Sequence, residues 1–183
     1  MLATNRQLKF DYVTRNYELR GDMVYSKLTG EKVKFTRNSV SGRKAQSCHL
    51  TDGERLTRST KYYSVNEHEA VWMLYHRKPI PEGNFHIHHI DGDALNNRPE
   101  NLILLSARLH LLFHRLKDRS GKRYRFTTNP KNKSAPWIAR VNLPTGQRLA
   151  RCFRTETDAA AWVEKQYTPI INNFKKLGMW GEL

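Results

Sequence analysis

One stretch of the chain, residues 85–102, reads FHIHHIDGDALNNRPENL and constrains the fold more than any other. It holds three histidines, two aspartates and three asparagines. The alternation in FHIHHI predicts a strand, and Asp91-Gly92 predicts a turn after it. A polar loop and a short apolar run, NLILL, follow. The sequence therefore predicts two strands joined by a loop whose polar groups build a turn, hold a structural metal or perform chemistry.

A helix is expected directly after the second strand. Ser106 is a favourable N-cap residue. The apolar residues that follow recur at helical spacing: Leu109, Leu112, Phe113 and Leu116. His110 and His114 are four residues apart, so their side chains share one face of this helix, away from the leucine stripe. That spacing suits a pair of metal ligands.

His88 and His89 are consecutive on the expected strand and should point to opposite faces. Both could bind one metal only if the strand bends. Two helical histidines and one strand histidine would leave a coordination position open, as a catalytic metal requires. A structural zinc site of three or four histidines is the alternative. The two cysteines, Cys48 and Cys152, form no CxxC pair, so neither a disulfide framework nor a cysteine-based zinc site is expected.

The chain is strongly basic, with 32 Lys and Arg against 17 Asp and Glu and a formal net charge of +15. Twelve of the basic residues lie between 115 and 154, where Asp118 is the one acid. A charge of this size predicts a polyanionic partner, and nucleic acid is the first candidate. No apolar run approaches the ~20 residues of a membrane span, and the N-terminus has no signal-peptide core. We therefore expect a cytoplasmic protein without a membrane partner.

The whole chain is expected to be an α+β protein of four segments, at 1–80, 81–118, 121–168 and 169–183. Segment 34–58 is polar and is expected to have little structure. The first segment should otherwise supply four strands and a helix at 66–77 that prolines stop. Asn66 with Glu69 is a weak capping signal for this helix, and its apolar residues recur at helical spacing. The four strands are expected at 8–13, 22–28, 31–35 and 61–65.

The segment at 121–168 predicts three strands and a helix. The strand candidates are RYRFTT, WIARVNL and RLARCF. Thr155 and Asp158 form a capping pattern at the start of an alanine-rich helix. Strand alternation turns Trp137, Ala139 and Val141 toward that helix and leaves Ile138 and Arg140 on the opposite face.

The motif HIHHIDGDALNNRPENLILLSARLHLLFH resembles the HNH nuclease motif, also called the ββα-metal fold. The resemblance implies that His88, His110 and His114 bind a divalent metal. It further implies that His89 is the general base that activates water. Asn101 would tie the loop together and orient His89 through backbone contacts.

This resemblance also implies a reaction. The expected activity is hydrolysis of DNA phosphodiester bonds at a preferred site, leaving 5′-phosphate and 3′-hydroxyl ends. Mg²⁺ is expected for turnover, with Zn²⁺ or Mn²⁺ as alternatives, because all-histidine ligation suits transition metals. The segment before the motif is similar to that of phage-type HNH homing endonucleases. A monomer would nick double-stranded DNA, and a homodimer could cut both strands.

Two other functions remain open. The chain could be a non-catalytic DNA-binding regulator with a structural histidine-metal site, although His89 then has no role. It could also be a toxin or defence nuclease, against which a separate recognition domain and the absence of secretion features argue.

Residues 121–168 resemble the ethylene-response-factor type of DNA-binding domain, which is similar to APETALA-two domains. The matching features are WIARV, the GQR turn and FRTETDAA. The resemblance implies a three-stranded antiparallel sheet, backed by one helix, that enters the major groove. The residues expected to contact DNA are Arg123, Arg125, Arg140, Arg148 and Arg151.

Overall fold

The computed structural model describes residues 5–37, 44–49, 62–117 and 126–180. Helices and small sheets alternate along the chain, which confirms the expected α+β class. The chain divides into two compact units, 1–105 and 106–183, whereas the sequence predicted four segments. No helix in the described ranges is both long and apolar enough to span a bilayer.

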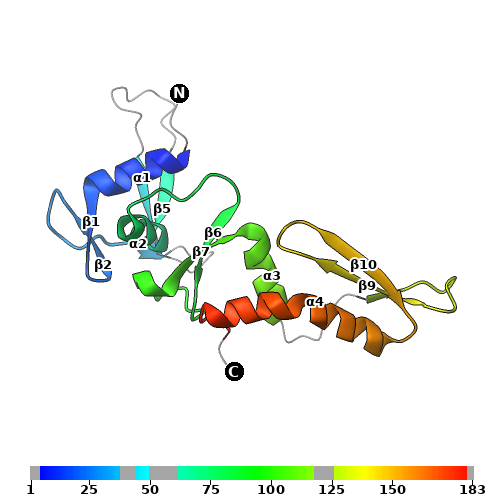
Figure 1. The fold of residues 1–183 in the computed structure, drawn as a ribbon. Helices are drawn as coiled ribbons and strands as arrows, with labels where there is room; N and C mark the ends of the chain where they lie inside the picture. The colour runs from blue at the N-terminus through cyan, green and yellow to red at the C-terminus, as the bar shows by residue number, and fades with distance from the viewer. Residues whose placement is uncertain (1–4, 38–43, 50–61, 118–125, 181–183) are drawn as a thin grey trace. The chain divides into compact units, whose positions relative to one another are not determined.

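The described residues of the first unit form three small sheets and two α-helices. Figure 1 labels most of these elements. The sheets pair β1 with β2, β3 with β4 and β5, and β6 with β7. The elements in chain order are α1 (Asn5–Asn16), β1 (Tyr17–Arg20), β2 (Met23–Ser26), β3 (Thr36–Arg37), β4 (Lys44–His49), β5 (Tyr62–Asn66), α2 (Glu67–His76), β6 (Phe85–His89), the 3-10 helix η1 (Pro99–Asn101) and β7 (Leu102–Ser106).

Helix α2 lies at the centre of this unit and supplies much of its core. Val71 is fully buried, and Trp72 and Met73 are nearly so. The helix begins with a capping box, in which the Glu69 carboxylate accepts hydrogen bonds from the backbone N–H of Asn66 at 2.9 Å and from its side-chain amide at 3.1 Å. The sequence predicted both this helix and its cap. The cap matters for function because it fixes the first turn of α2, where Glu67 lies.

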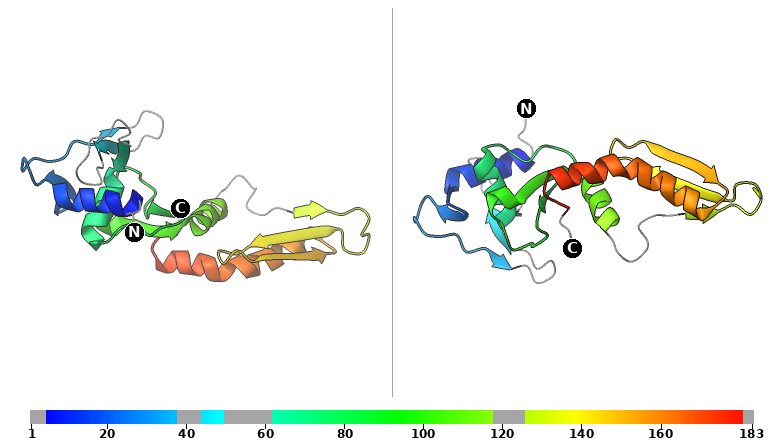
Figure 2. Two further views of the ribbon diagram at one scale, coloured as in Figure 1. Left: turned by 90° about the horizontal axis from the view of Figure 1, so that it is seen from above. Right: turned by 60° about the horizontal axis from the view of Figure 1, so that its bottom comes forward.

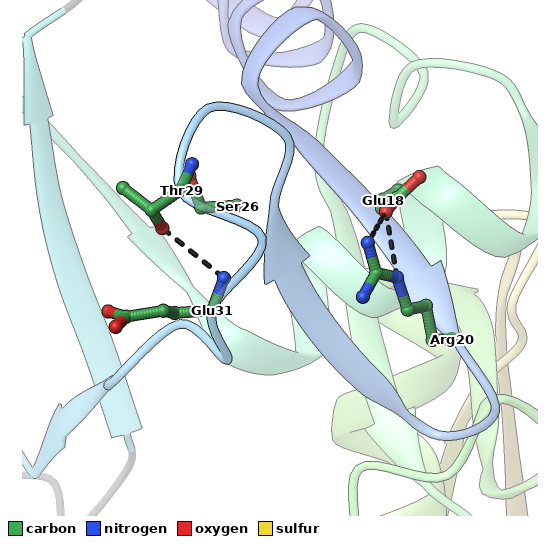
Figure 3. A network of polar contacts seen from close by, with 5 residues as sticks. All are labelled: Glu18, Arg20, Ser26, Thr29 and Glu31. Atoms are coloured by element: carbon green, nitrogen blue, oxygen red, sulfur yellow. Dashed lines mark hydrogen bonds and ion pairs between the residues drawn. The ribbon is translucent and has the colours of Figure 1, made fainter.

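The β1–β2 hairpin is held at its surface by short polar contacts (Figure 3). Arg20 donates to the Glu18 carboxylate at 2.8 Å within β1. In the turn after β2, the Ser26 hydroxyl accepts from the Thr29 N–H and the Thr29 hydroxyl accepts from the Glu31 N–H, both at 3.3 Å. Side-chain acceptors of this kind stabilise tight turns.

The strand predicted at 8–13 is wrong, because these residues lie in α1. Their apolar alternation satisfies a strand pattern, but α1 packs against α2 instead. Val13 is fully buried there, and Leu8 and Phe10 pack against the same core. Burial against a neighbouring helix outweighs the local strand propensity.

Two further predictions in this unit need correction. The strand at 31–35 reduces to an isolated bridge between Tyr25 and Lys32. The segment at 34–58 contains β4, which pairs with β3 and β5, although the sequence predicted little structure there. The polar sequence of β4 has no strand pattern, but pairing with β3 and β5 gives its backbone the hydrogen bonds of a strand. The predicted strands at β2, β5, β6 and β7 are confirmed.

The described part of the second unit holds a three-stranded antiparallel sheet, in the order β10-β9-β8, and two helices. The long helix α4 lies along one face of this sheet (Figure 2). Ala139 and Val141 are fully buried on that face, as are Ala159 and, nearly, Val163 of the helix. The predicted orientation of the middle strand is therefore confirmed. The elements are α3 (Ala107–Lys117), β8 (Phe126–Thr128), β9 (Trp137–Asn142), β10 (Arg148–Phe153) and α4 (Glu156–Lys176).

Helix α4 continues through Pro169 to Lys176, beyond the boundary at 168 that the sequence suggested. Its last turns are held by packing against α3. Phe174 is fully buried, and its ring centroid lies 5.0 Å from that of Phe113 on α3. Met179, also fully buried, follows the helix. These contacts offset the hydrogen bond that a proline removes from a helix interior.

Replacing Phe174 tests this packing. Phe174→Ala should lower the free energy of unfolding by about 3–5 kcal/mol, because it empties a buried aromatic site. Leu111→Ala is the matched control on α3, since Leu111 is 70% exposed and its loss should cost no more than about 0.5 kcal/mol. Urea unfolding followed by circular dichroism measures both. Equal losses for the two variants would contradict the docking of α4 on α3.

Candidate functional site

The two consecutive histidines stand at the end of β6, just before the loop to β7. His88 and His89 are each 6% exposed. Ile87 before them belongs to the core of the first unit. Histidine side chains are usually only partly buried, so two adjacent buried imidazoles are unusual. Buried polar groups need hydrogen-bond partners, and these partners determine the chemistry that each ring can perform.

Asn101 clamps the loop between β6 and β7. Its side-chain oxygen accepts from the backbone N–H of Asp91 at 3.1 Å. Its amide donates to the Asp91 carboxylate at 2.9 Å and to the backbone carbonyl of Asn96 at 2.8 Å. The backbone N–H of Ile90 in turn donates to the Asn101 carbonyl at 2.9 Å. One buried side chain thus fixes both ends of the loop, as the sequence suggested.

Asp91 and Asp93 form hydrogen bonds within the loop itself. Asp91 accepts from the Asp93 N–H at 2.8 Å and from the Asn96 amide at 2.7 Å, and Asp93 accepts from the Leu95 N–H at 2.9 Å. Burial alone would raise the pKa of Asp91, but the hydrogen bonds from Asn101 and Asn96 outweigh burial and hold the pKa below its ordinary value. The carboxylate therefore remains charged at neutral pH and keeps accepting these bonds.

The side chain of His89 is held by Asn97, not by Asn101. His89 Nε2 lies 2.9 Å from Asn97 Oδ1, and Asn97 Nδ2 donates to the Glu67 carboxylate at 3.0 Å. No local sequence pattern links Asn97 to His89. The link depends on Glu67, which lies 30 residues away in the chain and meets Asn97 only after α2 packs beside the loop.

The polar chain of Glu67, Asn97 and His89 determines which ring nitrogen of neutral His89 carries the proton. A carboxylate can only accept hydrogen bonds, so the amide nitrogen of Asn97 must face Glu67. The amide oxygen of Asn97 must then face His89 and accept from Nε2. Neutral His89 consequently carries its proton on Nε2 and its lone pair on Nδ1. A neutral imidazole in this form can take a proton at Nδ1.

The two histidines of α3 face one another. The distance between His110 Nε2 and His114 Nε2 is 3.1 Å. Two imidazole nitrogens bound tetrahedrally to one zinc ion, each at ~2.0–2.1 Å, would be roughly 3.3–3.4 Å apart. Burial lowers the pKa of His114, and the nearby charge of Lys117 lowers it further. The neutral ring, which alone can bind a metal, is thereby favoured.

Each of the three predicted ligands has a side chain that suits a divalent transition metal. His88, His110 and His114 each offer one imidazole nitrogen, a ligand that zinc, copper, nickel and iron accept. His88 lies in the first unit, and the helical pair lies in the second. Helix α3 begins at the predicted cap, where the Ser106 hydroxyl accepts from the Leu109 N–H at 3.3 Å.

The face of the sheet opposite α4 carries exposed basic residues. Arg140 and Arg148 are exposed, and the register places both on this face together with Asn142. Arg140 donates to the Thr127 hydroxyl of β8 at 2.7 Å. Arg123 and Arg125, also predicted to contact DNA, lie outside the described residues.

Arg151 differs from the other arginines of this sheet. It pairs with Ala139, whose side chain faces α4, so the register turns Arg151 to the helix side. Its guanidinium lies 5.6 Å from the centroid of the Phe153 ring. Side chains alternate along a strand, so Arg151 shares a face of β10 with Phe153 and Arg148 lies on the other face. This alternation in the sequence could have separated the two arginines.

Comparisons with known proteins agree with the motif in this segment. Residues 67–112 match the family model described as HNH endonuclease. The match begins at Glu67 and includes both strand histidines, Asn97, Asn101 and His110. This segment is therefore similar to HNH endonucleases.

A solved structure described as "DNA binding and cleavage by the HNH homing endonuclease I-HmuI" is similar to this chain. The sequence identity is 19%, the TM-score is 0.39, and the alignment covers 80% of this chain and 76% of that one. A TM-score of this size does not define a shared fold. No curated protein matches the chain.

The clamp at Asn101 can be tested by stability. Asn101→Ala removes three hydrogen bonds of a buried side chain and should lower the free energy of unfolding by about 1–3 kcal/mol. Asn96→Ala is the control, because it loses one exposed bond and should cost less than about 1 kcal/mol. Urea denaturation compares the two variants. A smaller loss for Asn101→Ala than for Asn96→Ala would contradict the clamp.

Proposed function

We propose that this chain is a metal-dependent, homing-type DNA endonuclease that cleaves at a preferred site and leaves 5′-phosphate and 3′-hydroxyl ends. The observation that carries the proposal is the polar chain from Glu67 through Asn97 to His89. It lies within the segment that matches HNH endonucleases, and it leaves a lone pair on Nδ1 of a buried histidine. A positioned imidazole with a free lone pair is the kind of group that can accept a proton from water.

His88, His110 and His114 would hold the divalent metal. The separation of His110 Nε2 and His114 Nε2 suits two ligands of one ion. Helix α3, which carries both histidines, begins directly after β7 ends at Ser106. A bound divalent ion supplies charge neutralisation at the scissile phosphate and at the leaving 3′ oxygen. Three protein ligands leave room for the substrate. Mg²⁺ is the metal proposed for turnover, with Zn²⁺ or Mn²⁺ as alternatives.

His89 is proposed as the general base. Its Nδ1 accepts the proton of the attacking water, and the ring becomes an imidazolium. The Nε2–H already donates to Asn97, and Glu67 lies behind Asn97, so the new positive charge is stabilised without reorganisation. Asn101 acts indirectly, because it fixes the loop that carries Asn97.

The second unit is proposed to bind the DNA. The described three-stranded sheet with its helix supports an ethylene-response-factor-like domain. Arg140 and Arg148 on the exposed face are proposed to contact bases or phosphates in the major groove. Arg123 and Arg125 are proposed with them, whereas the register of Arg151 favours a contact at the sheet edge. One HNH motif per chain implies nicking by a monomer and cleavage of both strands by a homodimer.

A plasmid-nicking assay tests the reaction. Wild-type protein should nick supercoiled plasmid with Mg²⁺, Mn²⁺ or Zn²⁺ and should be inactive with excess chelator. His89→Ala should be at least ~100-fold slower, since general base catalysis contributes about 10²–10⁴-fold. DNA binding by the variant, measured with chelator present, should be unchanged. Metal-independent cleavage, or equal rates for variant and wild type, would rule the mechanism out.

Glu67→Gln tests how the base is oriented. A glutamine can present either its oxygen or its nitrogen to Asn97, so the amide of Asn97 is no longer fixed. A fraction of His89 would then carry its proton on Nδ1, and kcat should fall by roughly 10-fold, less than the ~100-fold minimum expected without the base. Glu69→Gln is the matched control on the same helix turn, because the glutamine oxygen can still accept the capping bonds from Asn66 and Glu69 does not contact Asn97. Equal kcat values for Glu67→Gln and wild type would exclude this role.

A further inference from the structure

A basic groove lies within the second unit, between α3 and the turn that joins β9 to β10. The cavity has a volume of about 930 Å³. Among the residues that the structure describes, the lining includes four cationic side chains and no carboxylate: Arg108, Arg115, Lys117 and Arg148. His114 also lines it, so the groove reaches the histidine pair of α3. Four cations without an acid in one concave surface indicate an anionic ligand.

The turn is shaped to admit Arg108. Gly146 has a φ of +92°, and a β carbon built there would lie 2.4 Å from Arg108 Nη1. The absent side chain at Gly146 therefore makes the space that the guanidinium fills. The turn is closed by hydrogen bonds between residues 143 and 147 at 2.9 Å and between residues 146 and 143 at 3.0 Å. The Arg108 guanidinium thus lies close against the tight turn at Gly146.

Arg115 is positioned from the other side. Its guanidinium donates to the Tyr167 hydroxyl at 2.6 Å and lies 5.6 Å from the centroid of the same ring. Tyr167 is 2% exposed, so this anchor is part of the packing of α3 on α4. A neutral phenol leaves the positive charge of the arginine uncompensated. The groove therefore keeps its cationic character although one of its arginines is held in place.

Arg148 belongs to two surfaces. It lies on the exposed face of the sheet with Arg140, and it also lines the groove. A polyanion that leaves the sheet face at Arg148 would pass Arg108 and Lys117 and arrive beside His114. Within the second unit these residues form one continuous cationic path.

We propose that this groove binds the phosphate backbone of duplex DNA without regard to sequence and carries the strand from the recognition sheet to the metal-binding helix. The proposal rests on the proposed function, since it takes DNA as the substrate. It assigns Arg108 and Lys117 to phosphate contacts, which position DNA but do not specify it. Sequence preference is left to Arg140 on the sheet.

The salt dependence of binding tests this assignment. Binding to a labelled short duplex of random sequence should be measured by fluorescence anisotropy, with chelator present, over a range of salt concentrations. Arg108→Ala and Lys117→Ala should each weaken binding equally on duplexes of different sequence. Each should also reduce the slope of log K against log salt by about one, because one phosphate contact is lost. Arg108→Lys should keep the wild-type slope, since the charge remains.

Lys165→Ala is the matched control, because Lys165 is an exposed lysine of α4 that does not line the groove. Its slope should equal that of wild type. Thermal unfolding of each variant shows whether the fold is retained. If wild type binds the duplex and Arg108→Ala and Lys117→Ala keep its slope, the groove proposal is overturned. If wild type binds DNA but never cleaves it with metal, the proposed function fails while the groove proposal stands or falls on the slopes alone. If wild type binds no duplex, both are overturned.

Discussion

The carboxylate of Glu67 accepts hydrogen bonds and cannot donate them, and the geometry around His89 depends on that fact. It fixes which end of the Asn97 amide faces His89, and thereby which ring nitrogen of His89 keeps its lone pair. Glu67 itself is fixed because it stands in the first turn of α2, directly after the capping box at Asn66. The positive end of the helix dipole favours a charged carboxylate at this position. A helix cap in the sequence thus leads to a defined tautomer in the site.

Two asparagines of one loop have separate tasks. Both polar atoms of the Asn101 side chain form hydrogen bonds within the loop, to Asp91 and Asn96, and neither bonds to His89. Asn97 can serve His89 only because that clamp holds the loop in place. In the second unit, Gly146 leaves room for the Arg108 guanidinium, and the Tyr167 hydroxyl accepts a hydrogen bond from Arg115.

The sequence predicted those parts whose causes are local. The cap and periodicity of α2, the apolar alternation of β9 and the spacing of His110 and His114 all act within a few residues, and each reappeared in the structure. Segment 8–13 was mispredicted because its alternation suits a strand while packing on α2 makes it a helix. The role of Asn97 could not be read from the sequence, because its partner Glu67 is 30 residues distant and approaches only through the fold.

The protonation of His89 tests this account most directly. Long-range proton–nitrogen NMR correlation of the histidine rings, at a pH where the imidazoles are neutral, distinguishes the two ring nitrogens. If Glu67 and Asn97 orient the ring as described, His89 carries its proton on Nε2 and Nδ1 shows the shift of an unprotonated nitrogen. In Glu67→Gln the same spectrum should show a mixture of tautomers. A wild-type His89 protonated on Nδ1 would contradict the role given to Glu67 and Asn97, and with it the proposed base.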